Sequence, residues 1–198
     1  LELVRPLCVL TDEAHQTALA AVWPEEKTLL LDGELPSAGG EEERAIRQGL
    51  ERIIDTDPLC LINTSGSTGT PKSVVLNHRS FLDFTEWALE ATPIGGEEIV
   101  GSLSPSVFDI YSFELCMMMA RSSTLVLIPD AMAAFPARIL QLLQERRVTF
   151  LFWVPTIMVN IANMGLLEKV PLPDLKMVWF AGEVFPTKQF NIWRRNLP

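Results

Sequence analysis

Short apolar runs alternate along this chain with longer segments in which apolar residues recur at helical spacing, and this alternation restricts the possible folds strongly. The runs have the length of buried strands, and the segments between them have the length of helices that cross a sheet. Strands are expected at 7–10, 28–31, 59–63, 99–103, 124–128, 149–153 and 176–180. Helices are expected at about 13–22, 42–53, 78–90, 109–119, 136–146, 156–164 and 186–195. The pattern predicts an α/β fold, a layered sheet with crossover helices.

Residues that favour helix borders stand where this pattern places them. Thr11 and Asp12 precede the first helix and are suited to cap its N-terminus, and Pro136 suits an early helical position. Gly165 follows a helix end, where glycine is favoured. The run Glu41–Glu43 is expected in the first turn of a helix, where carboxylates interact well with the helix dipole.

Size and composition favour one globular unit. The chain has 198 residues, of which 48% are hydrophobic, so it can bury a core as a single α/β subdomain over residues 1–198. No apolar run approaches the roughly 20 residues that span a bilayer, and no basic segment followed by an apolar one opens the chain. We therefore expect an intracellular, cytoplasmic protein with no membrane partner.

Charge and cysteine content argue against other classes. A net charge of −9 repels phosphate backbones, and no basic stripe is interleaved with aromatic residues, so nucleic acid is not an expected partner. The three cysteines, Cys8, Cys60 and Cys116, are odd in number and lack the spacing of metal ligands. No metal site and no disulfide is expected, and the cysteines are expected to be buried and inert.

A segment rich in glycine and hydroxyl groups follows the strand expected at 59–63. It reads Thr64, Ser65, Gly66, Ser67, Thr68, Gly69, Thr70, Pro71 and Lys72. Glycine lets the backbone approach a ligand closely, hydroxyl and backbone N–H groups donate hydrogen bonds, and lysine adds a positive charge. The segment therefore predicts a polyphosphate-binding loop, with an ordinary Gly/Ser turn as the alternative.

A P-loop NTPase is the nearest competing interpretation of this segment. The pattern G-x-x-x-x-G-K-[ST] almost fits from Gly66 to Ser73, but Pro71 stands where a glycine is required. Proline has no N–H to offer a phosphate. The residues after Lys72 also look more like a strand than like the helix that a P-loop enters, so this alternative is the weaker one.

The segment from Thr64 to Lys72 resembles the phosphate-loop signature of the adenylate-forming superfamily. That superfamily includes acyl-CoA synthetases, luciferases, nonribosomal peptide synthetase adenylation domains and D-alanine:carrier-protein ligases. Later landmarks of the family follow in the same order: Val74 to His78, Phe108-Asp109, Val154-Pro155-Thr156 and Ala181-Gly182-Glu183. The resemblance covers residues 4–198 and implies that the chain is a subdomain of the acetyl-CoA synthetase-like fold.

Two positions beside the loop depart from the family pattern. The family usually has an aromatic residue where Asn63 stands and a glycine where Ser73 stands. Ser73 is expected to alter the exit of the loop. Neither departure removes a charge or a hydroxyl group from the signature.

The resemblance implies a reaction and a nucleotide site. The substrate carboxylate attacks the α-phosphorus of ATP to give an aminoacyl-AMP and pyrophosphate, and the aminoacyl group then moves to a phosphopantetheine thiol on a carrier protein, as in nonribosomal peptide synthesis. Lys72 and Thr68 are implied as catalytic residues. The implied ATP-binding residues are Thr64, Ser65, Gly66, Ser67, Thr68, Gly69, Lys72, Gly182 and Glu183. For Glu183, a carboxylate at a helix N-terminus is the alternative.

The resemblance also implies an amino-acid site. Asp109 occupies the position whose carboxylate binds the substrate ammonium in amino-acid-activating members, although an aspartate there could also be a helix N-cap. The side-chain pocket is expected to be lined by Ile110, Phe113, Phe152, Trp179 and Ala181, each of which could instead be plain core. These large aromatics in the pocket would leave room for a small side chain. The stretch from Trp179 to Pro186 looks most like that of D-alanine:carrier-protein ligases.

Several parts of the family are not found in this sequence. It has no Tyr-Gly-Pro-Thr-Glu-like segment, whose glutamate serves Mg²⁺ in relatives, no later aspartate for the ribose, and no small C-terminal domain. The chain is therefore expected to be a central fragment of the large N-terminal adenylation domain, inactive by itself, with the Mg²⁺ ligand elsewhere. A noncatalytic nucleotide-binding or scaffold homologue and a fatty or aryl acid ligase are the remaining alternatives.

Overall fold

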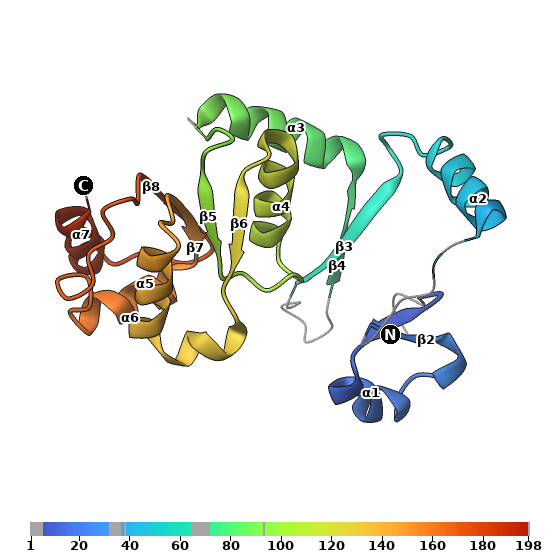
Figure 1. Cartoon of the computed structure of the whole chain (residues 1–198), viewed down its shortest axis with the longest axis horizontal. Helices are drawn as coiled ribbons and strands as arrows, with labels where there is room; N and C mark the ends of the chain where they lie inside the picture. Colours follow the sequence, from blue (N-terminus) through green and yellow to red (C-terminus); the bar gives the residue numbers. More distant parts are fainter. Residues whose placement is uncertain (1–5, 32–36, 38, 65–71, 93, 198) are drawn as a thin grey trace. The chain divides into compact units, whose positions relative to one another are not determined.

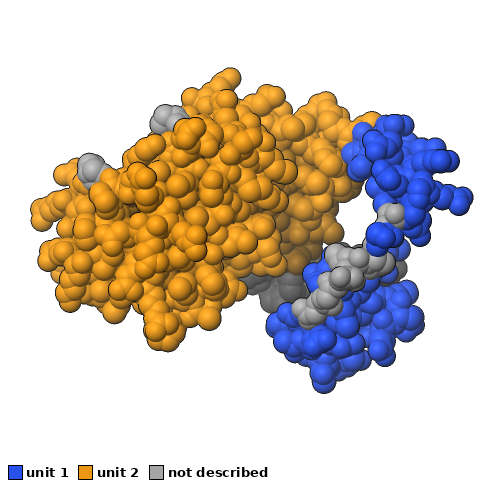
Figure 2. Space-filling model, in the orientation of Figure 1, with its two compact units in different colours: residues 1–53 blue, residues 54–198 orange. Residues whose placement is uncertain are grey.

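The structure is a computed structural model that describes residues 6–31, 37, 39–64, 72–92 and 94–197. The chain forms two compact units, residues 1–53 and residues 54–198, which Figure 2 shows in different colours. The single subdomain expected over residues 1–198 stays a prediction. Among the described residues, no helix is both long enough and apolar enough to cross a membrane.

The first unit is small and has little buried surface. Its elements are β1 (Val9–Thr11), α1 (Glu13–Ala20), a 3-10 turn (Glu25–Lys27), β2 (Thr28–Leu30) and α2 (Gly40–Leu50). Strands β1 and β2 pair in parallel. Asp12 caps α1 by accepting a hydrogen bond from the N–H of His15 at 2.9 Å, and Glu41–Glu43 occupy the first turn of α2, as predicted.

The second unit is built on a parallel sheet, which confirms the predicted α/β class. Its strands are β5 (Ile99–Ser102), β6 (Thr124–Leu127), β7 (Phe150–Trp153) and β8 (Met177–Phe180), in the spatial order β6-β5-β7-β8. Parallel neighbours need a crossover, and helices supply each one (Figure 1). The helices are α4 (Asp109–Arg121), α5 (Pro136–Glu145), α6 (Pro155–Asn163) and, after β8, α7 (Thr187–Asn196).

Apolar side chains alternate between the two faces of this sheet and form a core on each. Val100 and Phe150 pack with Phe113 and Met117 of α4 and with Ala88 of α3 (His78–Ala91). The opposite face holds the larger core, in which Leu151 and Trp153 pack with residues of α5, α6 and α7. Because successive strand residues point to opposite faces, α3 and α4 cover one side and α5 to α7 the other.

A β-hairpin precedes the sheet in the second unit. Strands β3 (Pro58–Thr64) and β4 (Lys72–Asn77) are antiparallel, with Thr64 opposite Lys72. The strand β4 was not among the predicted strands, although the residues after Lys72 look strand-like. Asn77 ends β4 and caps α3 by accepting from the N–H of Ser80 at 2.9 Å, so the hairpin leads directly into that helix.

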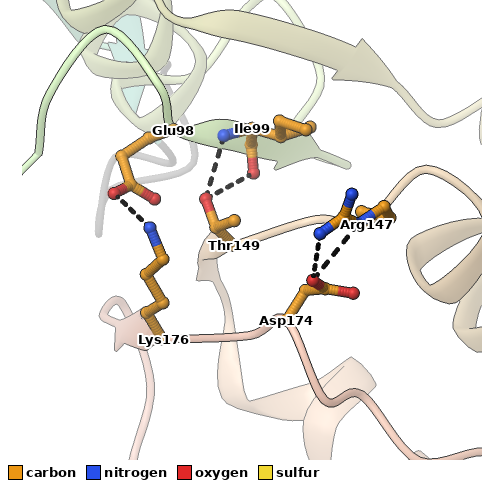
Figure 3. Close-up of polar contacts among 6 residues, drawn as sticks. All are labelled: Glu98, Ile99, Arg147, Thr149, Asp174 and Lys176. Carbon is orange, nitrogen blue, oxygen red and sulfur yellow. Dashed lines mark hydrogen bonds and ion pairs between the residues drawn. The ribbon is translucent and has the colours of Figure 1, made fainter.

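Polar contacts join the amino-terminal ends of the sheet strands (Figure 3). Lys176 Nζ lies 2.9 Å from Glu98 Oε1, and the hydroxyl of Thr149 accepts from the N–H of Ile99 at 2.9 Å. Arg147 and Asp174 form a further ion pair at 3.1 Å. The lysine and arginine side chains are largely exposed, so each ion pair contributes little, about 0–1 kcal/mol. These contacts therefore stabilise the amino-terminal edge of the sheet, which is opposite to its carboxyl edge.

The prediction that all three cysteines are buried is wrong. Cys8 is exposed, and Cys60 and Cys116 are half-buried. Cys8 lies in the first unit, where none of the described residues is fully buried, because so few elements cannot enclose a core. Burial, and to a smaller extent the neighbouring Cys116, raises the pKa of the Cys60 thiol, so it is a poor nucleophile near neutral pH.

Candidate functional site

The strand order creates a crevice at the carboxyl edge of the sheet. The chain leaves β5 through α4 toward β6, whereas it leaves the adjacent β7 through α6 toward β8, on the other side. The loops after β5 and β7 therefore diverge. In open α/β sheets such a switch point is the usual place for a ligand, because diverging loops leave space above the strand ends.

A pocket of about 520 Å³ lies at this edge. The loops after β5, β7 and β8 contribute to it, together with residues of β7, the start of α4, and one residue each of α3 and α6. Its lining residues are Phe84, Leu103, Ser104, Pro105, Phe108, Asp109, Ile110, Phe113, Phe152, Trp153, Val154, Ile157, Ala181, Gly182 and Glu183. The structure thus brings together Asp109, Ile110, Phe113, Phe152, Ala181, Gly182 and Glu183, which sequence reasoning assigned to substrate or nucleotide binding. Their roles in binding stay predictions.

Asp109 is not the N-cap of α4. It is the first residue of that helix, and the N-cap position is held by Phe108, whose side chain makes no capping hydrogen bond. The Oδ1 atom of Asp109 accepts from the N–H of the next residue, Ile110, at 3.0 Å. Asp109 is exposed in the wall of a largely apolar pocket, so its carboxylate is accessible to a cationic group. The capping alternative is therefore wrong.

Trp179 packs behind the pocket rather than lining it. Its ring stacks on that of Phe113 with centroids 5.5 Å apart and an interplanar angle of 17°, and it meets Phe152 edge-on at 5.7 Å. Trp179 instead lines a neighbouring groove of about 420 Å³, which also includes Phe84 and Trp87. Trp179, whose large ring was expected to line the pocket, thus lies behind the aromatic side chains that do line it. The preference for a small substrate side chain stays a prediction.

Glu183 connects the loop after β8 to the first turn of α6. Its Oε2 atom accepts from the N–H of Thr156 at 3.0 Å and from the Thr156 hydroxyl. Gly182 turns the chain with φ +88°, a conformation that disfavours other residues. Glu183 is therefore a carboxylate at a helix N-terminus, but the helix is α6 and not α7, which follows it in sequence. Its predicted contact with the nucleotide is compatible with this bond and stays a prediction.

The central part of the expected phosphate loop lies outside the described residues. This concerns Ser65, Gly66, Ser67, Thr68, Gly69, Thr70 and Pro71. Thr64 and Lys72, which flank them, are paired across the β3–β4 hairpin. The segment after Lys72 is a strand, whereas a P-loop enters a helix, so the structure contradicts the P-loop NTPase alternative.

The two positions that depart from the family pattern contact each other. Asn63 on β3 is directly opposite Ser73 on β4. The Ser73 hydroxyl donates to Asn63 Oδ1 at 2.6 Å. A serine next to a glycine-rich loop thus has a specific partner, and the two substitutions form one cross-strand pair at the base of the hairpin tip.

Sequence reasoning missed Glu114, which is fully buried in α4. Its Oε2 atom accepts from the hydroxyl of Ser102 at 2.5 Å, and Oε1 has no hydrogen-bond partner among the described residues. Burial raises the pKa of this carboxyl to about 8, although the Ser102 hydroxyl opposes the shift. A signal was present: Glu114 is four residues after Ile110 and three before Met117, on the apolar stripe of the helix.

No metal site can be built from the described residues. Within those ranges, no three His, Cys, Asp or Glu side chains lie close enough together to hold an ion. The acidic groups of the pocket are Asp109, at the start of α4, and Glu183, in the loop after β8, and the second accepts hydrogen bonds from Thr156.

Comparisons with known proteins agree with the resemblance. The family model described as AMP-binding enzyme matches residues 1–198. A Streptomyces coelicolor protein named L-proline--[L-prolyl-carrier protein] ligase is 29% identical over 84% of this chain and 32% of its own length. A Staphylococcus aureus D-alanine--D-alanyl carrier protein ligase is 30% identical over 68% of this chain and 28% of its own length.

The fold also matches a solved structure. The crystal structure of the nonribosomal peptide synthetase FmoA3 superposes with a TM-score of 0.80 over 100% of this chain and 20% of that chain, at 22% identity. This likeness confirms the predicted acetyl-CoA synthetase-like fold. The chain spans about a third or less of the length of the relatives described above. Since the family model matches the whole sequence, the chain belongs to the AMP-binding enzyme family, which comprises adenylate-forming ligases.

Proposed function

We propose that this chain is part of an ATP-dependent ligase that activates an amino acid as its adenylate and loads it onto the phosphopantetheine thiol of a carrier protein. The observation that carries the proposal is the Asp109 carboxylate, which caps no helix and is exposed in the wall of an apolar pocket. A carboxylate there suits a substrate ammonium, because a charge-assisted hydrogen bond is stronger away from bulk water. Relatives named as proline and D-alanine carrier-protein ligases support the same reading.

The chemistry requires positioning more than covalent catalysis. The substrate carboxylate oxygen bonds to the α-phosphorus of ATP as the bond from that phosphorus to the pyrophosphate oxygen breaks. Asp109 would hold the ammonium and so aim the carboxylate at the nucleotide, while Lys72 and Thr68 would stabilise charge on the phosphoryl oxygens. Mg²⁺ is expected to accompany the ATP phosphates, and because no described residues form a ligand group for it, no step is assigned to it.

A fatty or aryl acid is the competing substrate class, and Asp109 distinguishes the two. An acid without an ammonium gains nothing from this carboxylate and must tolerate an unpaired charge at the pocket wall. The pocket is otherwise mostly apolar and accommodates either class. The charge of Asp109 therefore favours an amino acid.

The test is pyrophosphate exchange by the full-length protein across a panel of amino acids and simple carboxylic acids. Asp109→Ala should abolish amino-acid-dependent exchange while leaving ATP binding unchanged, because the ammonium loses its counter-charge. Asp109→Asn is the matched control for shape and should lose most of the same activity. Exchange by Asp109→Ala at the wild-type level would show that the ammonium site is elsewhere.

The isolated 198-residue chain is expected to show no exchange activity, since it covers about a third of the length of a carrier-protein ligase. Amino-acid-dependent exchange from this chain alone would contradict that expectation. A noncatalytic scaffold is the second candidate function. Titration of the full-length protein with ATP and with a nonhydrolysable aminoacyl adenylate analogue separates the two, because a scaffold without a site binds neither.

A further inference from the structure

The hydrogen bond between Ser102 and Glu114 joins β5 to α4, and the loop between these two elements forms part of the pocket wall. Ser102 is the last residue of β5, and Glu114 lies in the second turn of α4. The chain between them contributes Leu103, Asp109 and Phe113 to the pocket. The hydrogen bond therefore links the two ends of the segment that carries Asp109, the proposed ammonium ligand.

Within the described part of the chain, the start of α4 has few other polar attachments. Phe108 at the N-cap position makes no side-chain capping bond, and Asp109 bonds to the backbone of its own neighbour. The helix is otherwise held to the sheet by apolar packing of Phe113 and Met117 with Val100 and Phe150. Apolar contacts are not directional, whereas a hydrogen bond fixes the separation and orientation of two atoms.

A carboxyl group is a costly choice for this position. Glu114 is 0% exposed and Ser102 is 3% exposed, and Oε1 of Glu114 has no partner within the described part of the chain. A leucine at this position together with an alanine at 102 would bury no polar group, and replacing both partners of a buried polar contact by apolar residues is often neutral or stabilising. Packing alone therefore does not explain the carboxyl, whereas a need for fixed geometry between α4 and β5 does.

We propose that Glu114 is a positioning residue, which through its hydrogen bond to Ser102 fixes the first turn of α4 and holds the Asp109 carboxylate at the substrate ammonium. The inference rests on the proposed function. Glu114 lies beneath the pocket wall and does not line the pocket, so it acts through Asp109 and not by touching the substrate. Loss of the contact should weaken amino acid binding while leaving the nucleotide site unaffected.

Two single variants break the contact, and their double variant separates positioning from folding. Ser102→Ala leaves both oxygens of Glu114 without a partner, and Glu114→Leu leaves the buried Ser102 hydroxyl without one, so both single variants should lower stability. Both should raise the KM for the amino acid about three- to tenfold, with the KM for ATP unchanged. The double variant should raise this KM no further than either single variant, because one contact is lost in all three, and it should be more stable than either because it leaves neither buried group unpaired. Glu114→Gln can keep the hydrogen bond and should retain the wild-type KM.

The experiment is steady-state pyrophosphate exchange by the full-length protein, combined with hydrogen–deuterium exchange of peptides covering residues 103–113. Faster amide exchange in Ser102→Ala and Glu114→Leu, but not in Glu114→Gln, is expected. Unchanged amide exchange and an unchanged amino acid KM in Glu114→Leu would overturn the inference, as would an equal rise in the KM for ATP. If the wild-type protein shows no amino-acid-dependent activity while the amide exchange follows the expected order, the proposed function fails and the positioning contact stands.

Discussion

Replacing Glu114 with glutamine should remove a pH dependence from the stability of this protein. The carboxyl has a pKa of 4.5 in the unfolded chain, and burial raises the pKa to about 8 in the folded chain. Below pH 4.5 both states hold the proton, so burial of the carboxyl brings no pH-dependent cost. Between the two values the unfolded chain releases a proton that the folded chain retains, so stability falls as pH rises, and above pH 8 the loss is complete. Glutamine cannot titrate and should show no such loss.

The magnitude follows from the two pKa values. A difference from 4.5 to about 8 corresponds to a maximum of about 5 kcal/mol, at about 1.36 kcal/mol for each pKa unit. Between pH 5 and pH 8 the free energy of unfolding of the wild type should fall by about 3.5 kcal/mol relative to Glu114→Gln, or about 1 kcal/mol for each pH unit. Other groups titrate equally in both proteins and cancel in the difference. Such a change is a large fraction of the stability of a typical domain, about 5–15 kcal/mol.

The assay is urea unfolding of both proteins at pH 5, 6, 7 and 8, followed by tryptophan fluorescence. Trp153 and Trp193 are 1% and 2% exposed, so their emission reports loss of the core. Ser102→Ala is a matched control, since it keeps the carboxyl and should keep a pH slope while lowering stability at every pH. A difference between wild type and Glu114→Gln that stays constant from pH 5 to pH 8 would refute the reasoning, because it would mean that the carboxyl titrates alike in both states.

Two further predictions concern packing and the hairpin. Gly101→Ala places a methyl group 2.7 Å from Leu151 Cδ2 and should destabilise the fold by about 1 kcal/mol or more, measured by chemical unfolding, whereas Gly49→Ala, with no neighbour within 4 Å, should not. A loss in Gly49→Ala equal to that in Gly101→Ala would contradict the packing argument. Alanine replacements of Asn63 and Ser73 should show a coupling of about 0.5–1 kcal/mol in a double-mutant cycle of unfolding. Strict additivity would mean that their hydrogen bond contributes nothing in solution.

Local pattern was sufficient for most of the secondary structure. The strands β5 to β8 lie within one residue of the predicted borders, and α4 begins at Asp109 as expected. The reason is that apolar periodicity and capping residues depend on neighbours within a turn or along a strand. The strand β4 was not predicted because its apolar centre is a short run of three residues, Val74 to Leu76, directly after the glycine-rich segment.

The candidate site was predicted from motifs, and the structure adds their relative positions. Residues 109–113, 152 and 181–183 are far apart in sequence, and the parallel strand order brings their loops to one edge of the sheet. The order of the strands in the sheet cannot be derived from the spacing of these residues along the sequence. The resemblance to a known family gave the prediction, and the diverging crossovers at β5 and β7 give its physical basis.

The sequence by itself determined the α/β class, the helix borders and the set of polar residues available for chemistry, because these depend on short-range pattern. Tertiary structure alone decided that Trp179 stacks behind Phe113, that Glu183 caps α6, and that Glu114 is enclosed with Ser102 as its partner. Each of these contacts joins residues on separate elements. A carboxylate can be solvated, bound to a helix end or buried as an acid, depending on which surfaces the crossover helices place against it. The local spacing of residues in the sequence does not specify those surfaces.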